Sequence, residues 1–134
     1  MSTQIFVNLP VTDLDASKAF YTALGYTIDE QFTDENASCV VISDSIYVML
    51  LTEAFAKQFT TKAIADASAT TEVINALTAD SREAVDRLAD AALAAGASPV
   101  KEPQDEGFMY SRSFADPDGH QWEVLHMDAS ALEG

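Results

Sequence analysis

Glu123 is the residue with the clearest chemical potential. It lies near the end of the chain in the segment Gln121-Trp-Glu-Val-Leu125. An apolar surround makes a carboxyl group a candidate general base or general acid. Arg112 is the only cation near this region by sequence, and it could bind a carboxylate or stabilise an oxyanion. Strand arginines are more often simply exposed, so both interpretations of Arg112 stay open.

The histidines and the single cysteine are weaker candidates for a chemical role than Glu123. His120 and His126 fall on the same strand parity as Trp122, opposite to Glu123, because side chains alternate along a strand. We therefore expect both imidazoles to point away from Glu123. A lone cysteine allows no intrachain disulfide, and Cys39 in its apolar stretch is predicted to be a buried, unreactive thiol.

The elements that must position these residues follow a strand–helix–three-strand pattern that occurs twice. Apolar alternation predicts the first strand over 5–11, and the helix after it begins near Asp13 and ends at Gly25. The later helix is predicted to begin with the capping box Asp80-Ser-Arg-Glu83 and to end at Gly96. Further strands are predicted at 26–32, 37–43, 46–51, 72–78, 98–102, 108–115 and 120–127, with a short helix at 53–59.

The two halves of the chain align with each other. Phe6–Asp13 lies over Val73–Asp80 at a constant offset of 67, with asparagine and aspartate at matching places. We predict an α+β fold of two βαβββ repeats that form an open, cup-shaped mixed sheet, since a lone repeat would leave one sheet face uncovered. The prediction is one domain over 1–134: repeat one 4–52, connector 53–70, repeat two 71–127 and tail 128–134.

Charge and hydropathy exclude some partners. The formal net charge of −15 repels phosphate backbones and anionic lipid, so neither nucleic acid nor a membrane is expected to bind. A cationic ligand would be attracted, although the charge could also serve only solubility. No apolar run approaches the roughly 18 residues of a membrane span, and the first residues do not resemble a signal peptide. A cytoplasmic location is expected.

Two segments carry a family resemblance. They are Val11-Thr-Asp-Leu-Asp-Ala-Ser-Lys-Ala-Phe-Tyr-Thr-Ala-Leu-Gly25 and Asp116-Pro-Asp-Gly-His-Gln-Trp-Glu123. In this order, with a second helix between them, they resemble the vicinal-oxygen-chelate superfamily of glyoxalase I, bleomycin-resistance proteins and extradiol dioxygenases. The resemblance covers nearly the whole chain. It implies a cup that, in the enzymes of the family, holds a divalent metal on His and Glu ligands from the first and last strands of each repeat.

The metal-ligand positions of the family are mostly lost here. The resemblance places them at Phe6, at Val73 (or Ile74 if the alignment slips by one), at Met49 and at Glu123. Only Glu123 can bind a hard or borderline cation, because a thioether such as Met49 prefers Cu(I). A stable zinc site normally needs three or four protein ligands. We therefore predict no metal site and expect no cofactor.

The cup is predicted to be mostly apolar, with a few convergent polar groups, which is typical of a site for a small organic ligand. The side chains predicted to line it, or to lie beside it in the case of Arg112, are Phe6, Asn8, Tyr47, Met49, Leu51, Val73, Asn75, Leu77, Arg112, Gln121, Glu123 and Leu125. The same set could instead be a collapsed core between sheets, and for Asn8 and Asn75 both interpretations stay open.

Three functions follow from this set. The leading hypothesis is a metal-independent protein of the glyoxalase/bleomycin-resistance type that binds a small organic, cationic compound, acting as a homodimer. The alternative is a glyoxalase-type lyase or isomerase (lactoylglutathione-lyase-like) that acts on a 2-oxoaldehyde–thiol adduct with Glu123 as base or metal ligand. A third hypothesis treats the cup as packed core and the protein as an interaction module.

Overall fold

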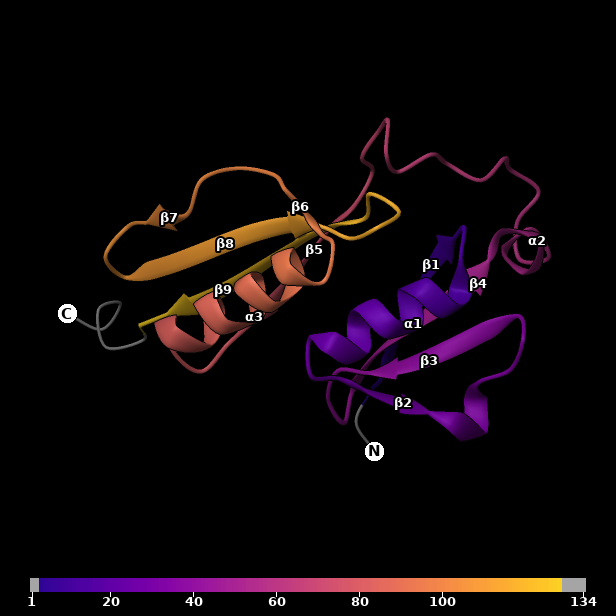
Figure 1. Cartoon of the computed structure of the whole chain (residues 1–134), viewed down its shortest axis with the longest axis horizontal. Helices are drawn as coiled ribbons and strands as arrows, with labels where there is room; N and C mark the ends of the chain where they lie inside the picture. The colour runs from indigo at the N-terminus through magenta and orange to yellow at the C-terminus, as the bar shows by residue number, and fades with distance from the viewer. Residues whose placement is uncertain (1–2, 129–134) are drawn as a thin grey trace. The chain divides into compact units, whose positions relative to one another are not determined.

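The computed structural model describes residues 3–128 and divides into two compact units. The first unit ends at Asp66 and the second begins at Ala67, so the boundary lies inside the predicted connector. Each unit combines one mixed sheet with one main helix (Figure 1). The predicted α+β class is confirmed, and the first half has the predicted strand–helix–three-strand order, whereas four strands follow the helix of the second half.

The first unit contains a four-stranded sheet, sheet A, in the order β1-β4-β3-β2. Its parallel pair is β1 with β4, and the other pairs are antiparallel. The elements are β1 (Ile5–Val11), α1 (Leu14–Ala23), β2 (Thr27–Asp29), the 3₁₀ turn η1 (Glu30–Phe32), β3 (Ala37–Val41), β4 (Ile46–Thr52) and α2 (Glu53–Ala56).

Helix α1 begins and ends where its residue types predict. The Asp13 carboxylate accepts a hydrogen bond from the amide of Ala16, which satisfies one free N–H of the first turn. Phe20 and Tyr21 are buried in edge-to-face contact. Gly25 ends the helix with a φ of 105°, a conformation that L side chains rarely adopt. The helix contacts β3 and β4 and therefore covers one face of sheet A.

The second unit contains a five-stranded sheet, sheet B, in the order β5-β9-β8-β6, and β7 also pairs with β8. Its parallel pair is β5 with β9. The elements are β5 (Ile74–Thr78), α3 (Arg82–Ala94), β6 (Ser98–Pro99), β7 (Gln104–Asp105), β8 (Met109–Ala115) and β9 (Gln121–Met127).

Helix α3 lies along β8 and β9 (Figure 1). Val85 and Ala89 are buried against Val124 of β9, which makes the core of this unit. The Ser81 hydroxyl caps the helix by accepting from the amide of Ala84 at 3.0 Å. The predicted capping box is therefore wrong by one residue, because Glu83 lies one position too early to complete it.

Two predicted strands are shorter than expected. The strand predicted at 98–102 ends at Pro99 as β6, and a loop over 100–103 separates it from β7; Pro99 and Pro103 have no N–H to donate to a ladder. The strand predicted at 26–32 ends at Asp29, whose carboxylate accepts from the amide of Gln31 and starts a 3₁₀ turn. The predicted tail lies outside the described residues from residue 129 onward. Among residues 3–128, no helix is long and apolar enough to cross a membrane.

Candidate functional site

Strand register decides which side chains accompany Glu123. In the ladders of sheet B, Glu123 is directly paired with Ala76 of β5 and with Ser113 of β8. Directly paired residues point their side chains to the same face of a sheet. We call this surface the Glu123 face; its members are Ile74, Ala76, Thr78, Ser111, Ser113, Ala115, Gln121, Glu123 and Leu125. The opposite surface, which α3 covers, is the α3 face.

Lys101 is the cation that the structure brings to Glu123. Its Nζ lies 3.1 Å from Oε1 of Glu123 and donates to Oε1 of Gln104 at 3.2 Å. The Glu123 side chain is 25% exposed and that of Lys101 is 41% exposed. The carboxylate is thus within reach of solvent, and one flexible ammonium neutralises it.

Sequence reasoning missed Lys101. It lies in the loop 100–103 between β6 and β7. That loop stands opposite only two residues of β8, since Pro99 pairs with Phe114 and Gln104 pairs with Ser111. The extra length is a bulge, which re-aims side chains. The prolines on either side of Lys101 were the available signal that the predicted strand breaks there.

Ser113 adds a buried hydroxyl beside the carboxylate. The residue is 7% exposed, and its Oγ has no hydrogen-bond partner among the described residues. Most buried polar atoms in native proteins have a partner, so an unpaired hydroxyl at this place calls for a physical explanation. Ser111, two residues earlier on the same face, is also buried.

The predicted face of β5 is wrong. Asn75 pairs with Trp122 and Leu77 pairs with Val124, so both lie on the α3 face. Val73 precedes the strand and is 58% exposed. The residues of β5 on the Glu123 face are Ile74, Ala76 and Thr78.

The cause is a one-residue slip in the alignment of the halves. Met49 pairs with Asn8, whereas Glu123 pairs with Ala76, so the equivalent strands are offset by one more residue than the predicted alignment has. A shift of one residue moves every side chain of a strand to the other face.

Arg112 lies on the α3 face, away from Glu123. Its Nη1 is 2.8 Å from Oδ1 of Asp90 and 3.1 Å from Oδ1 of Asp86, both on α3. The Tyr110 hydroxyl donates to the same Asp86 oxygen at 2.6 Å. These contacts hold the pKa of Asp86 below its ordinary value, chiefly through the Tyr110 hydrogen bond. The structure assigns Arg112 to a helix–sheet network and not to the Glu123 face.

Neither His126 nor Cys39 is a member of the Glu123 face. His126 pairs with Tyr110 on the α3 face, as predicted, and its Nδ1 is 2.9 Å from the carbonyl of Ala79. His120 precedes β9, so strand alternation does not place it. Cys39 is 1% exposed, and burial is the main cause that raises the pKa of its thiol. The predicted buried thiol is confirmed.

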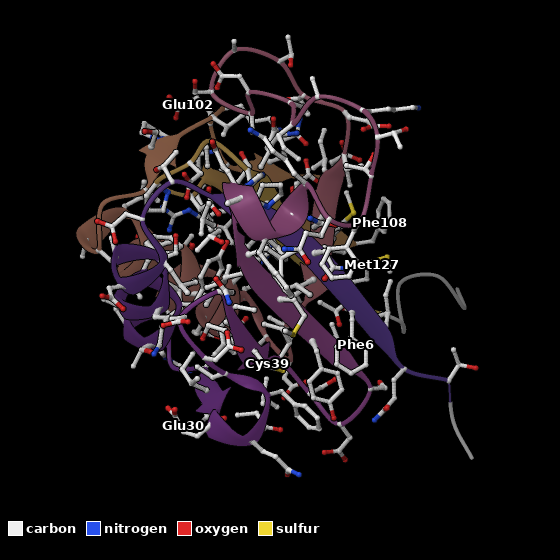
Figure 2. The ribbon with its side chains drawn as sticks, turned by 90° about the vertical axis from the view of Figure 1, so that its right-hand side faces the viewer. Phe6, Glu30, Cys39, Glu102, Phe108 and Met127 are labelled. Atoms are coloured by element: carbon white, nitrogen blue, oxygen red, sulfur yellow. The ribbon has the colours of Figure 1, made fainter. Side chains whose placement is uncertain are left out.

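In sheet A, the five predicted residues Phe6, Asn8, Tyr47, Met49 and Leu51 share one face. Phe6 pairs with Tyr47 and Asn8 with Met49, as the alternation predicts. The rings of Phe6 and Tyr47 are stacked with centroids 4.7 Å apart, and Phe6 is 46% exposed (Figure 2). Met49 packs against a buried cluster that contains Leu51. A role for these residues in binding stays a prediction.

The donor set does not fit the divalent metal that the resemblance implies. Within residues 3–128 there is no group of three or more His, Cys, Asp or Glu side chains that could hold a metal ion. Of the positions that the resemblance points to, Phe6 and Ile74 have no donor atom, and Met49 packs in an apolar cluster. Glu123 is already paired with Lys101.

A separate cavity of about 240 Å³ lies on the other side of the second unit. Its lining residues are Ser81, Arg82, Glu83, Gly107, Phe108, Tyr110, His126 and Asp128. Arg82 stands over the Tyr110 ring at 4.8 Å and pairs with Asp105 at 2.5 Å. Phe108 lies beside Met127 at the end of the β8–β9 ladder (Figure 2). No pattern in the sequence predicted this cavity, because it lies where the loop before β8 meets the start of α3.

The comparisons with known proteins identify the family. The sequence matches the Glyoxalase/Bleomycin resistance protein/Dioxygenase superfamily over residues 4–124, and the chain therefore belongs to this superfamily. No match was found among the curated proteins.

Solved structures of the same fold come from several bacteria. The hypothetical protein SA1046 from S. aureus is 28% identical, with a TM-score of 0.79 and 94% of each chain covered. A glyoxalase/bleomycin resistance protein/dioxygenase family enzyme from Burkholderia phytofirmans PsJN is 22% identical, with a TM-score of 0.76, over 94% of this chain and 99% of that one. Lactoylglutathione lyase from Agrobacterium tumefaciens is 19% identical, with a TM-score of 0.68 and 94% of each chain covered.

Proposed function

We propose that this protein binds a small organic molecule on the Glu123 face of sheet B. The observation that carries the proposal is the grouping of one carboxylate, one ammonium and one buried hydroxyl at Glu123, Lys101 and Ser113. Around them the face holds small or apolar side chains such as Ile74, Ala76 and Leu125. A few polar groups on an otherwise apolar surface are the usual composition of a small-ligand site.

The proposed binding needs no metal and no other cofactor. A zinc site normally takes three or four protein ligands, and Glu123 contributes one carboxylate, which Lys101 already neutralises. The recognition would instead come from ordinary hydrogen bonds and charge pairing at Glu123, supported by burial of the apolar part of the ligand.

A glyoxalase-type lyase or isomerase is the second candidate. A partly exposed carboxylate at Glu123 could take a proton from a bound thiol adduct of a 2-oxoaldehyde, and one similar structure carries the name lactoylglutathione lyase. In such a reaction Lys101 is the charge that could stabilise the negative oxygen that forms next to Glu123. Turnover of the glutathione–methylglyoxal adduct that is lost in Glu123→Gln would favour this candidate over binding alone.

The test of the binding proposal is a ligand screen by thermal shift in buffer that contains EDTA. Compounds that raise the melting temperature of the native chain should lose their effect in Glu123→Gln. Glu102→Gln is the matched control, because Glu102 is exposed in the same loop as Lys101. A screen in which every stabilising compound acts equally on both variants would count against the Glu123 face.

The net charge bears on the kind of partner that the protein binds. The net charge of −15 supports a cationic ligand and disfavours nucleic acid and anionic lipid. A homodimer and a cytoplasmic location are part of the same proposal. Light scattering on the purified chain tests the first, and fractionation of the producing cells tests the second.

A further inference from the structure

We infer that the ligand of the Glu123 face carries a protonated amine, and that Lys101 occupies the place of this amine in the ligand-free protein. The inference rests on the proposed function and specifies the chemical class of the ligand. It assigns Ser113 as a second ligand-binding residue and makes Lys101 a competitor of the ligand.

The contact between Lys101 and Glu123 is suited to exchange. Lys101 has a long side chain on a bulged loop and is 41% exposed, and the pair is not bidentate. Exposed ion pairs of this kind contribute little to stability, so breaking this one is not costly. The Lys101 ammonium can return to water, whereas a ligand amine that replaces it keeps Glu123 neutralised.

The Ser113 hydroxyl is a polar group next to Glu123 to which Lys101 makes no hydrogen bond. This hydroxyl lies across the strand pair from Glu123, is nine-tenths buried, and has no hydrogen-bond partner within residues 3–128. Lys101 donates to Glu123 and Gln104 but makes no bond to Ser113. An amine has several N–H donors, so one that lies over the β8–β9 pair could bond both the Glu123 carboxylate and the Ser113 oxygen.

Charge favours a cation over an anion at this face. A ligand carboxylate bound to Lys101 would lie beside the Glu123 carboxylate, which is 3.1 Å from the same ammonium. Two carboxylates held by one ammonium repel each other, which opposes binding. The net charge of −15 adds a long-range field in the same sense, attracting cations and repelling anions.

The test uses three probes of one shape: benzylamine, benzyl alcohol and benzoate. Each is titrated into the full-length, isotope-labelled chain while amide resonances are followed by NMR. The variants are Lys101→Met and Ser113→Ala. Their matched controls are Lys62→Met, an exposed lysine of the connector, and Ser38→Ala, a buried serine of β3 whose hydroxyl is also unpaired.

The inference predicts that benzylamine shifts amides of β8 and β9. Lys101→Met should bind benzylamine about two- to fivefold more tightly, the range set by loss of one exposed ion pair. Ser113→Ala should bind it about three- to tenfold more weakly, since one buried hydrogen bond is lost. Lys62→Met and Ser38→Ala should behave as the native chain, and binding of benzyl alcohol should not respond to Lys101→Met.

Two results would overturn the inference in distinguishable ways. If benzoate binds the Glu123 face best and Lys101→Met weakens it, Lys101 is an anion-binding residue; the proposed function then stands and the inference falls. If none of the three probes shifts amides of β8 or β9, the proposed function falls with it.

Discussion

Ser113 and Glu123 are direct cross-strand partners in the β8–β9 ladder, and the two side chains differ in their polar contacts. Glu123 is paired with Lys101, whereas the Ser113 hydroxyl is buried without a hydrogen bond in the part of the chain that the structure describes. An unmade bond next to a carboxylate is a feature that a ligand can complete. The Glu123 face therefore offers a charge with which a ligand can pair. Binding would also remove the free-energy cost of the unpaired Ser113 hydroxyl.

Ser113→Ala is expected to stabilise the ligand-free protein by up to about 1 kcal/mol, because it removes a buried hydroxyl that makes no hydrogen bond to any of residues 3–128. Ser38→Ala should do the same, since its hydroxyl is also buried and has no partner among the residues that the structure describes. Urea unfolding of both variants measures this. A loss of stability in Ser113→Ala, with none in Ser38→Ala, would mean that Ser113 already has a partner such as ordered water.

The network at Asp86 predicts a pH dependence. The pKa of Asp86 is lowered below its ordinary value of 3.8, first by the Tyr110 hydrogen bond and then by Arg112. A carboxyl with a lowered pKa in the folded state stabilises the fold above its ordinary pKa, and this contribution is lost as the pH falls through the folded pKa. Asp86→Asn should therefore lower the free energy of unfolding at pH 7 by about 0.5–1 kcal/mol, a small value because Asp86 is partly exposed.

The control for this prediction is Asp90→Asn. Asp90 contacts Arg112 but is more exposed and receives no Tyr110 bond. Asp90→Asn should therefore lower the free energy of unfolding by less than Asp86→Asn does. If the stability difference between Asp86→Asn and the native chain persists unchanged below the folded pKa of Asp86, the assigned cause is wrong.

Gly119 is predicted to tolerate no side chain. It has a φ of 92°, and a Cβ added there would lie 2.7 Å from backbone atoms of Ala67 and Ser68. Gly119→Ala should therefore cost about 2–4 kcal/mol in thermal or urea unfolding, from backbone strain and a clash that cannot relax cheaply. Gly107→Ala is the matched control, because Gly107 also has a positive φ but open space around it, and it should cost about 1–2 kcal/mol. Equal costs would show that the contact with Ala67 does not matter.

Cys39 is expected to report on unfolding of the first unit. It is buried in β3, and burial, with the charge of Asp29 as a further cause, raises the pKa of its thiol. Both effects disfavour the reactive thiolate. A thiol reagent at pH 7 should label native protein slowly and urea-unfolded protein fully. Rapid labelling without denaturant would contradict the burial of this strand.

Much of the fold could be predicted because local signals agree with the tertiary structure. The Asp13 cap, the stop at Gly25 and the alternation of β1 each depend on neighbouring residues, and the structure keeps all three. The strand at 98–102 was predicted wrongly because prolines interrupt its hydrogen bonds. The cup that the two repeats would form together stays a prediction.

The candidate site was harder to predict because it depends on register and on a bulge. Glu123 was placed correctly on the face opposite Trp122 and Val124. The face of β5 was not, because an offset between repeats that is wrong by one residue moves Asn75 to the other side. Lys101 was not predicted as the partner of Glu123 because it lies in a loop. Periodic patterns do not indicate where a loop places its side chains.

The most direct test of the account is to map where ligands bind when no metal is available. The isotope-labelled chain is screened by NMR against small amines, acids and neutral aromatics in EDTA, with Glu123→Gln and Glu102→Gln in parallel. We expect the best ligands to shift amides around Glu123 and Ser113, and only Glu123→Gln to abolish these shifts. Ligands that map instead to the cavity at Arg82 and Tyr110, or that bind the Glu123 face only after a divalent metal is added, would contradict it.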